Sequence, residues 1–123
     1  MPTDRPAPPR LIATTVDCHD LEAMTAFWGG LLEVETAIEE PYGFLAPSDD
    51  RRVTMWLQRV GDEFVGKNRV HVDLVVEDLD AAVARVEELG GASGDLHRWH
   101  GYVWRTCADP EGNLFDIMQA QAV

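Results

Sequence analysis

The stretch 68–91, NRVHVDLVVEDLDAAVARVEELGG, predicts a strand, a turn and an amphipathic helix. Apolar residues alternate over 69–76, and a strand points successive side chains to opposite faces. Asp78 then stands where a helix N-cap belongs, and apolar residues recur after it at helical spacing until two glycines end the pattern. The strand nevertheless contains His71 and Asp73, which a fully buried strand would not carry.

The same pattern occurs earlier in the chain. Residues 10–17 predict a strand, and Asp20 precedes a helix with an apolar stripe that we expect to fray or end at the glycine pair 29–30. The segments 19–27 and 77–85 share the order Asp-Leu-acid-Ala at a shift of 58 residues. An internal repeat of this kind predicts two structurally equivalent units.

Further strands complete each unit. Residues 42–60 predict two strands joined by a Pro-Ser-Asp-Asp turn, and the turn sequence DPEGN separates two strands at 101–108 and 113–119. Each unit then has a strand, a helix and about three strands, one of them weakly signalled. Neither unit could bury its helix stripe alone, so we expect the two to pack together.

The sequence therefore predicts an α+β fold. Two tandem βαβββ modules should form a curved, cup-shaped mixed sheet with the helices on its convex side. The expected divisions are an extended, proline-rich lead-in at 1–10 and a single domain at 11–120, made of modules 11–60 and 69–119.

Composition excludes several classes of partner. The 123 residues include 10 Lys and Arg against 22 Asp and Glu, which gives a formal net charge of −12. Nucleic acids and anionic membranes need a basic surface, so we expect neither as a partner. No apolar run is long enough to span a membrane, and Cys18 and Cys107 form no disulfide framework. These features predict a cytoplasmic protein with free thiols.

Strand alternation assigns side chains to the two faces of the expected sheet. In the second module, Val70, Val72, Leu74 and Val76 should face the helix. The opposite faces of both modules collect a polar and aromatic cup, whose principal residues are Thr15, Trp56, Gln58, His71, Asp73 and Asp116.

Paired units that open with Asp-Leu-acid-Ala helices, and a second unit that closes with ADPEGNLFDIM, resemble the vicinal-oxygen-chelate superfamily. That superfamily includes glyoxalase I, extradiol dioxygenases, fosfomycin-resistance enzymes and bleomycin-resistance proteins. The stretch 66–91 is similar to the glyoxalase-like domain branch, and the resemblance covers residues 11 to 119. It implies the fold and a small-molecule site, whereas the reaction varies widely on this scaffold.

The resemblance also implies metal ligands on the first and last strand of each module. These positions hold Ala13 and His71 on the first strands, and Gln58 and Asp116 on the last strands. Ala13 offers no ligand, so Gln58, His71 and Asp116 are the expected set. They suit one divalent ion among Fe, Mn, Ni, Zn and Co. An aspartate here replaces the glutamate usual in those enzymes.

Two functions of different classes follow. The first is a metal-dependent lyase, isomerase or dioxygenase acting on an oxygen-rich substrate, with His71 and Asp116 catalytic and with Thr15 and Asp73 contacting substrate. The second is a metal-free homodimer, similar to bleomycin-resistance proteins, that sequesters a cationic aromatic compound between walls containing Trp56 and Trp104.

The sequence is also compatible with other roles for the histidines. His71 could instead belong to a structural hydrogen-bond network with neighbouring carboxylates. His97 and His100 precede a strand near the cup mouth, where we expect a loop, with a role at the rim as the alternative. The sequence is compatible with both an enzyme and a non-catalytic binder.

Overall fold

The computed structural model describes residues 13–47, 54–61, 63, 66, 68 and 70–121. The predicted lead-in at 1–10 and part of the predicted Pro-Ser-Asp-Asp turn lie outside these residues. The first module contains β1 (Ala13–Cys18), α1 (Leu21–Leu32), β2 (Thr36–Glu39), β3 (Tyr42–Leu45) and β4 (Thr54–Arg59). The second contains β5 (Asp73–Val76), α2 (Leu79–Glu88), β6 (Ala92–Trp99), β7 (Tyr102–Ala108) and β8 (Leu114–Gln119).

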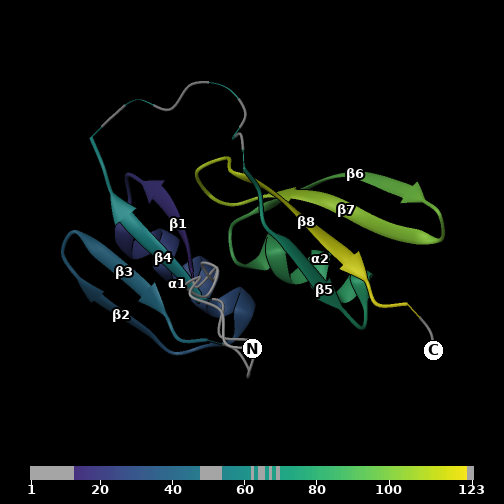
Figure 1. Ribbon diagram of the computed structural model, residues 1–123, viewed down its shortest axis with the longest axis horizontal. Helices are drawn as coiled ribbons and strands as arrows, with labels where there is room; N and C mark the ends of the chain where they lie inside the picture. The colour runs from purple at the N-terminus through teal and green to yellow at the C-terminus, as the bar shows by residue number, and fades with distance from the viewer. Residues whose placement is uncertain are drawn as a thin grey trace, which may run out of the picture.

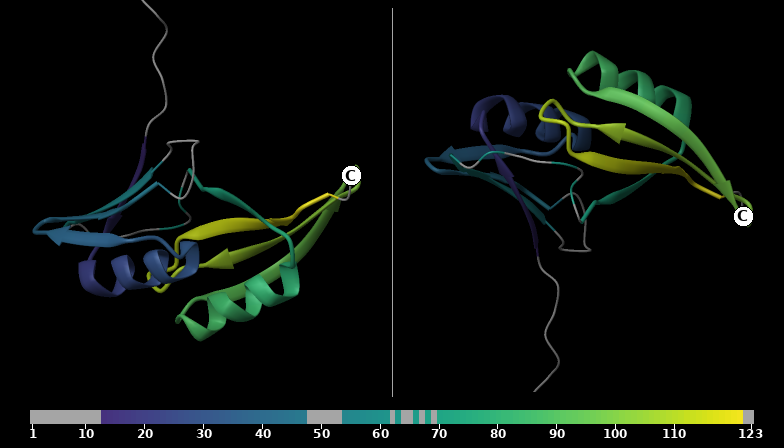
Figure 2. Two further views of the ribbon diagram at one scale, coloured as in Figure 1. Left: turned by 90° about the horizontal axis from the view of Figure 1, so that it is seen from below. Right: turned by 90° about the horizontal axis from the view of Figure 1, so that it is seen from above.

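The strands form two four-stranded mixed sheets with the same topology (Figure 1). The first has the order β1-β4-β3-β2 and the second the order β5-β8-β7-β6. In each sheet the first and last strands of the module run parallel and the other neighbours run antiparallel. Both helices lie on one side of the sheets, which leaves the opposite faces uncovered by helix (Figure 2). The predicted α+β fold of two βαβββ modules is confirmed.

The first helix begins as predicted but ends later. Asp20 accepts a hydrogen bond from the Ala23 amide at 3.0 Å, and the helix then runs through Gly29 and Gly30 to Leu32. Of the two predicted outcomes, fraying or ending at the glycine pair, the ending is wrong, because the helix stays regular to Leu32. A side chain at Gly29 would collide with Thr36 of β2, so this glycine lets a strand approach the helix closely.

The second helix agrees with the prediction. Asp78 accepts a hydrogen bond from the Ala81 amide at 3.1 Å. The helix ends at Glu88 with Leu89 as its C-cap, and Gly90 follows with a φ of 100°, a left-handed conformation that favours glycine. The repeated Asp-Leu motif is therefore a pair of equivalent helix starts.

The strands differ from the sequence prediction in two places. The strand predicted at 69–76 begins only at Asp73, and Val70 is 78% exposed rather than packed on the helix. The Val72 carbonyl still accepts a hydrogen bond from the Asp116 amide at 3.1 Å and Val72 packs against the core, whereas Val70 lies beyond the ladder with β8, where alternation no longer fixes its direction. The weakly signalled strand of the second half is β6, which carries little apolar alternation in ASGDLHRW and is mostly exposed.

The two modules share one core. Phe27 and Trp28 of α1 pack against Phe115 of β8, with ring centroids 4.7 Å apart between Trp28 and Phe115. The indole nitrogen of Trp28 donates to the buried carboxylate of Asp109 at 3.2 Å. Glu111, in the same β7–β8 turn, accepts hydrogen bonds from backbone amides at the start of α1, including that of Asp20 at 2.7 Å. The DPEGN turn therefore joins the modules.

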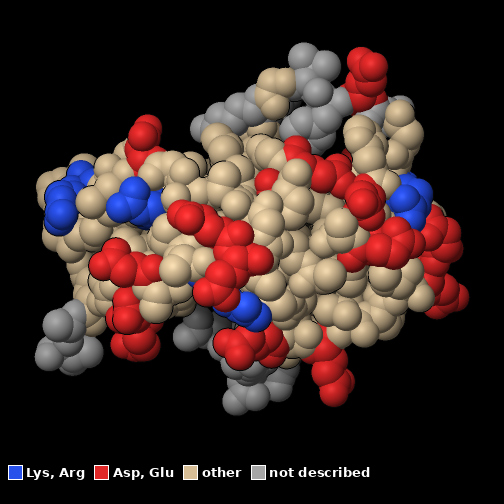
Figure 3. All heavy atoms as spheres, turned by 180° about the vertical axis from the view of Figure 1, so that it is seen from behind, with Lys and Arg blue, Asp and Glu red and all other residues tan. Residues whose placement is uncertain are grey.

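The surface agrees with the acidic composition. On the face that carries the helices, Asp and Glu side chains outnumber Lys and Arg side chains (Figure 3). Neither helix in the described part of the chain has the length and apolar character needed to cross a bilayer.

Candidate functional site

Three polar side chains meet on the second module. The Nε2 atom of His71 lies 3.3 Å from Asp73 Oδ1 and 3.3 Å from Asp116 Oδ2. Thr106 donates its hydroxyl to the other oxygen of Asp116 at 2.7 Å. Both oxygens of Asp116 are therefore engaged, and the threonine orients the carboxylate toward His71.

Strand register brings these groups together. Asp73 of β5 pairs with Asp116 of β8, and Asp116 pairs in turn with Thr106 of β7. Phe115 and Ile117 flank Asp116 in sequence and are buried in the core, so alternation directs the carboxylate to the opposite face. The sequence identified His71, Asp73 and Asp116 on this face but missed Thr106. Its position two residues after Trp104 on the same strand could have revealed it.

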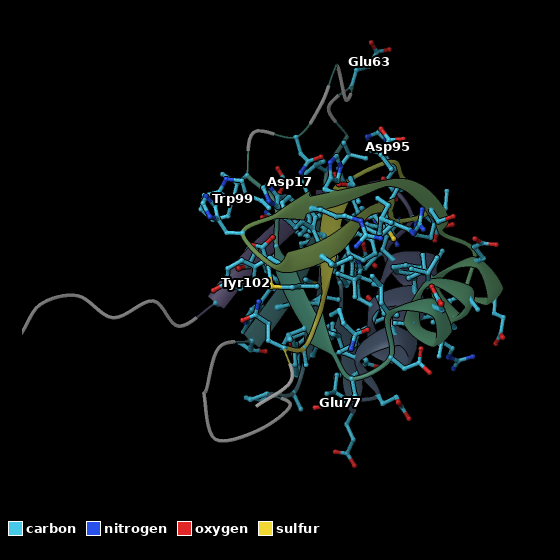
Figure 4. All side chains as sticks on the ribbon, turned by 90° about the vertical axis from the view of Figure 1, so that its right-hand side faces the viewer. Asp17, Glu63, Glu77, Asp95, Trp99 and Tyr102 are labelled. Carbon is cyan, nitrogen blue, oxygen red and sulfur yellow. The ribbon has the colours of Figure 1, made fainter. Side chains whose placement is uncertain are left out.

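An aromatic pocket of about 520 Å³ adjoins the cluster. Its polar part is formed by Asp73 and Asp116. The remaining lining side chains among the described residues are aromatic or thioether groups: Trp99, Tyr102, Trp104 and Met118. Trp99 and Tyr102 project from the β6–β7 hairpin on the side away from α2 (Figure 4). The predicted substrate contacts Asp73 and Trp104 therefore lie around the same pocket.

The hairpin that carries the aromatic wall differs from the expected loop. His97 lies within β6 and stacks on Trp104, with ring centroids 5.4 Å apart and an interplanar angle of 24°. His100 and Gly101 form the turn, with φ values of 47° and 83°. The loop prediction is wrong for His97 because the ladder with β7 extends to the end of the hairpin, where Trp99 pairs with Tyr102.

A second, smaller hollow of about 230 Å³ lies between the modules. It is lined by Thr15 of β1 on one side and His71 on the other, with Asp109 and Phe115 among the other lining residues. The predicted contact Thr15 therefore shares a hollow with His71. Trp56 belongs to the uncovered face of the first sheet, where its ring packs against Tyr42 and Phe44.

The ladders show how far the two modules are equivalent. Asp73 pairs with Asp116, and the corresponding first-strand residue, Thr15, pairs with Trp56 rather than with Gln58. The repeat offset is thus 58 residues on the first strand and 60 on the last strand. Gln58 lies in the first sheet, and no hydrogen bond or ion pair joins its side chain to His71 in the described part of the chain. Its role as a ligand stays a prediction.

The cluster has the spacing of a metal site. With metal–ligand bonds of about 2.1 Å, neighbouring donors of one ion lie roughly 3.0–3.4 Å apart. His71 Nε2 is at 3.3 Å from one oxygen of each carboxylate, and donor atoms of all three residues lie within 4.8 Å of one another. One imidazole and two carboxylates suit a borderline divalent ion. The same distances also suit an imidazole that bridges two carboxylates directly.

Paired βαβββ modules with a polar cluster on an open sheet face define the vicinal-oxygen-chelate class of protein. The sequence signature described as Glyoxalase-like domain matches residues 13–118, and the chain belongs to this family. No curated protein matches the sequence.

Several solved structures share the fold. A glyoxalase/bleomycin resistance protein/dioxygenase family enzyme from Burkholderia phytofirmans has a TM-score of 0.79 at 15% identity, covering 92% of this chain and 100% of that one. Fosfomycin resistance protein FosX from Listeria monocytogenes has a TM-score of 0.75 at 16% identity, covering 94% and 96%. Lactoylglutathione lyase from Agrobacterium tumefaciens has a TM-score of 0.67 at 20% identity, covering 93% and 96%. At these identities the likeness shows the fold alone.

Proposed function

We propose that this protein binds a small oxygen-rich molecule on the uncovered face of its second module and acts on it with the help of a divalent metal ion. The observation that carries the proposal is the position of His71 between two carboxylates at the edge of an aromatic pocket. Pockets of this kind, apolar with a few convergent polar groups, are the usual form of small-molecule sites.

His71 and Asp116 are the proposed ligands, with Asp73 a third donor in the same cluster and Gln58 retained as the ligand expected from sequence. A bound divalent ion would supply Lewis acidity toward vicinal oxygens of the substrate. Without a metal, His71 Nε2 could exchange a proton with a substrate atom beside Asp116, whereas a metal ion held by Nε2 would take that nitrogen out of proton transfer. Thr106 keeps Asp116 in place through its hydrogen bond of 2.7 Å.

A second candidate is a metal-free binder of a cationic aromatic compound. The first sheet favours it, because Trp56 is 37% exposed and lies within an aromatic patch with Tyr42 and Phe44. Ala13 also removes one of the four ligand positions expected from the superfamily. In this candidate the His71 cluster would orient the ligand through hydrogen bonds.

Both candidates are proposed to act as homodimers in the cytoplasm. The open faces of the two sheets present exposed aromatic side chains, including Trp56 and Trp99, and aromatic residues are enriched at protein interfaces. Cys18 and Cys107 are buried free thiols, which agrees with a reducing compartment. Light scattering coupled to size exclusion would measure the mass, and a monomer at micromolar concentration would contradict the dimer.

Metal content and thermal stability test the primary proposal. We expect stoichiometric binding of one ion among Fe(II), Mn(II), Ni(II), Zn(II) and Co(II), with stabilisation by several degrees, because the ligand binds only the folded state. The His71→Ala variant should lose both effects. His100→Ala, at the hairpin tip outside the cluster, is the matched control and should retain them. If the wild type binds none of these ions, the metal-dependent function is wrong and the metal-free binder remains.

A further inference from the structure

We infer that the aromatic pocket of the second module binds an organic ammonium group, so that the ligand of this protein carries a positive charge. The inference rests on the proposed function in one respect, because both take this face of the sheet as the ligand-binding side. It goes further by assigning an ammonium group to this particular pocket, and it applies to the site without a metal, because a divalent ion on Asp73 and Asp116 would offset the negative charge that attracts the ligand.

The walls of the pocket have the composition that favours an organic cation. Three of its lining residues, Trp99, Tyr102 and Trp104, present aromatic rings, and Met118 adds a polarisable thioether. Aromatic faces attract ammonium groups through their quadrupoles, and several rings around one pocket are the known means of binding quaternary ammonium ions. Neither lysine nor arginine contributes to the lining among the described residues.

The electrostatics of the pocket point the same way. Asp116 has both oxygens occupied, by Thr106 and by His71. Asp73 contacts His71 through Oδ1, whereas its Oδ2 atom has no partner in the described residues, and its side chain is 67% exposed. One carboxylate oxygen at the pocket is therefore free to face a ligand, and its negative charge adds a Coulombic attraction for a cation to the hydrogen bond that a neutral donor could also make.

Ring–ring contacts connect the side chains of the aromatic wall, of which Trp99 is 62% exposed. Trp99 and Tyr102 face each other across the hairpin with an interplanar angle of 18° and centroids 6.4 Å apart. His97 stacks on Trp104 from the neighbouring strand. Rings that are already ordered lose little conformational entropy on binding, so more of the cation–π attraction appears as affinity.

Arginine side chains near the pocket do not cancel its negative charge. Arg105 follows Trp104 on β7, so its side chain points to the opposite face of the strand, and its guanidinium donates to the backbone carbonyl of Gly94 at 2.8 Å rather than to a pocket carboxylate. Arg98 pairs with Val103, the ladder position next to the Trp99–Tyr102 pair that lines the pocket, so its side chain points to the opposite face of the hairpin. The pocket of about 520 Å³ exceeds what an alkylammonium group needs, which leaves room for the rest of a ligand beside Asp116.

Choline and its neutral analogue 3,3-dimethylbutan-1-ol test the inference, because the two have nearly the same shape and differ in charge. Binding is measured by isothermal titration calorimetry with EDTA present, so that no metal contributes. We expect choline to bind at least about tenfold more tightly than the alcohol, the difference that one favourable cation–π and carboxylate site supplies. Equal affinity for the two compounds, or no binding of choline, would overturn the inference.

Variants identify the groups responsible. Asp73→Asn, which removes the free charge from an exposed position without changing size, and Trp99→Leu, which removes one wall, should each weaken choline binding about threefold or more. Asp95→Asn is the matched control, because Asp95 projects from another part of β6 (Figure 4) and should leave choline affinity unchanged. An Asp73→Asn variant that binds choline as tightly as the wild type would also overturn the inference.

The two proposals fail separately. Loss of the choline preference with intact, His71-dependent metal binding would leave the proposed metal site standing and remove the ammonium pocket. Choline selectivity without metal binding would instead retain the pocket and support the metal-free binder.

Discussion

Replacing Asp109 by asparagine should destabilise the protein by about 2 kcal/mol because one buried donor would lose its acceptor. Oδ1 of Asp109 accepts the backbone amides of Glu111 and Asn113 at 3.0 and 2.9 Å. Oδ2 accepts the Trp28 indole at 3.2 Å and the Asn113 side-chain amide at 2.9 Å. An asparagine keeps one oxygen for the two backbone amides and places an amino group before the other two donors.

Those two donors differ in how they can respond. Asn113 can turn its side-chain amide and present its oxygen to the new amino group. The indole N–H of Trp28 has no acceptor end, so it stays buried and unpaired, since Trp28 is 2% exposed. An unsatisfied buried donor costs about 1–3 kcal/mol. For a chain of 123 residues this corresponds to a decrease in Tm of roughly 4–10 °C.

A double-mutant cycle with Trp28→Phe tests the reasoning. Phenylalanine removes the N–H donor, so Asp109→Asn should cost about 1–2 kcal/mol less in this background than in the wild type. The free energy of unfolding would be measured by urea titration and far-UV circular dichroism, because the substitution removes one of the fluorescent tryptophans. Additive effects within about 0.5 kcal/mol would refute the argument that Trp28 is the donor left unpaired.

Three further predictions concern other parts of the structure. Gly91→Ala should destabilise the protein by about 1–3 kcal/mol, because its Cβ would lie 2.6 Å from a backbone carbonyl oxygen of β7, whereas Gly61→Ala, in open space, should be neutral in the same urea titration. Thr106→Val removes the hydrogen bond to Asp116 and should weaken metal affinity about 10–100-fold, measured by calorimetry on the folded variant. Unchanged affinity would show that this hydrogen bond does not orient the carboxylate. Burial raises the pKa of the Cys18 thiol to about 11 from an ordinary value of 9.0, so a thiol reagent should modify Cys18 at neutral pH only on unfolding. Between these two pH values the folded state binds more protons than the unfolded state, so the free energy of unfolding should fall as the pH rises from about 9 to about 11. An unfolding free energy that does not change with pH over that range would contradict the prediction.

The local signals in the sequence were sufficient for much of the fold. Asp20 and Asp78 cap the two helices as predicted, because an aspartate N-cap bonds to a backbone amide only three residues away. Alternation placed Asp116 opposite Phe115 and Ile117 for the same reason, since the period of a strand is a local property. The repeat then gave the paired modules, and His71, Asp73 and Asp116 were all expected on the uncovered face.

Long-range packing decided the rest. The helix continues through Gly29, where the small residue lets β2 approach closely, and β6 forms because its hairpin with β7 supplies the ladder partners, neither of which the apolar pattern of these segments indicates. Equivalent residues of the two modules are 58 positions apart on the first strand and 60 apart on the last strand, because of the residues that pair across β1–β4 and β5–β8. A single shift of 58 residues along the sequence therefore could not show that Trp56 is the equivalent of Asp116. The sequence thus determined which side chains face away from the core. The tertiary structure determined which of those side chains contact one another, because such contacts depend on strand pairing and on interactions between residues up to 92 positions apart.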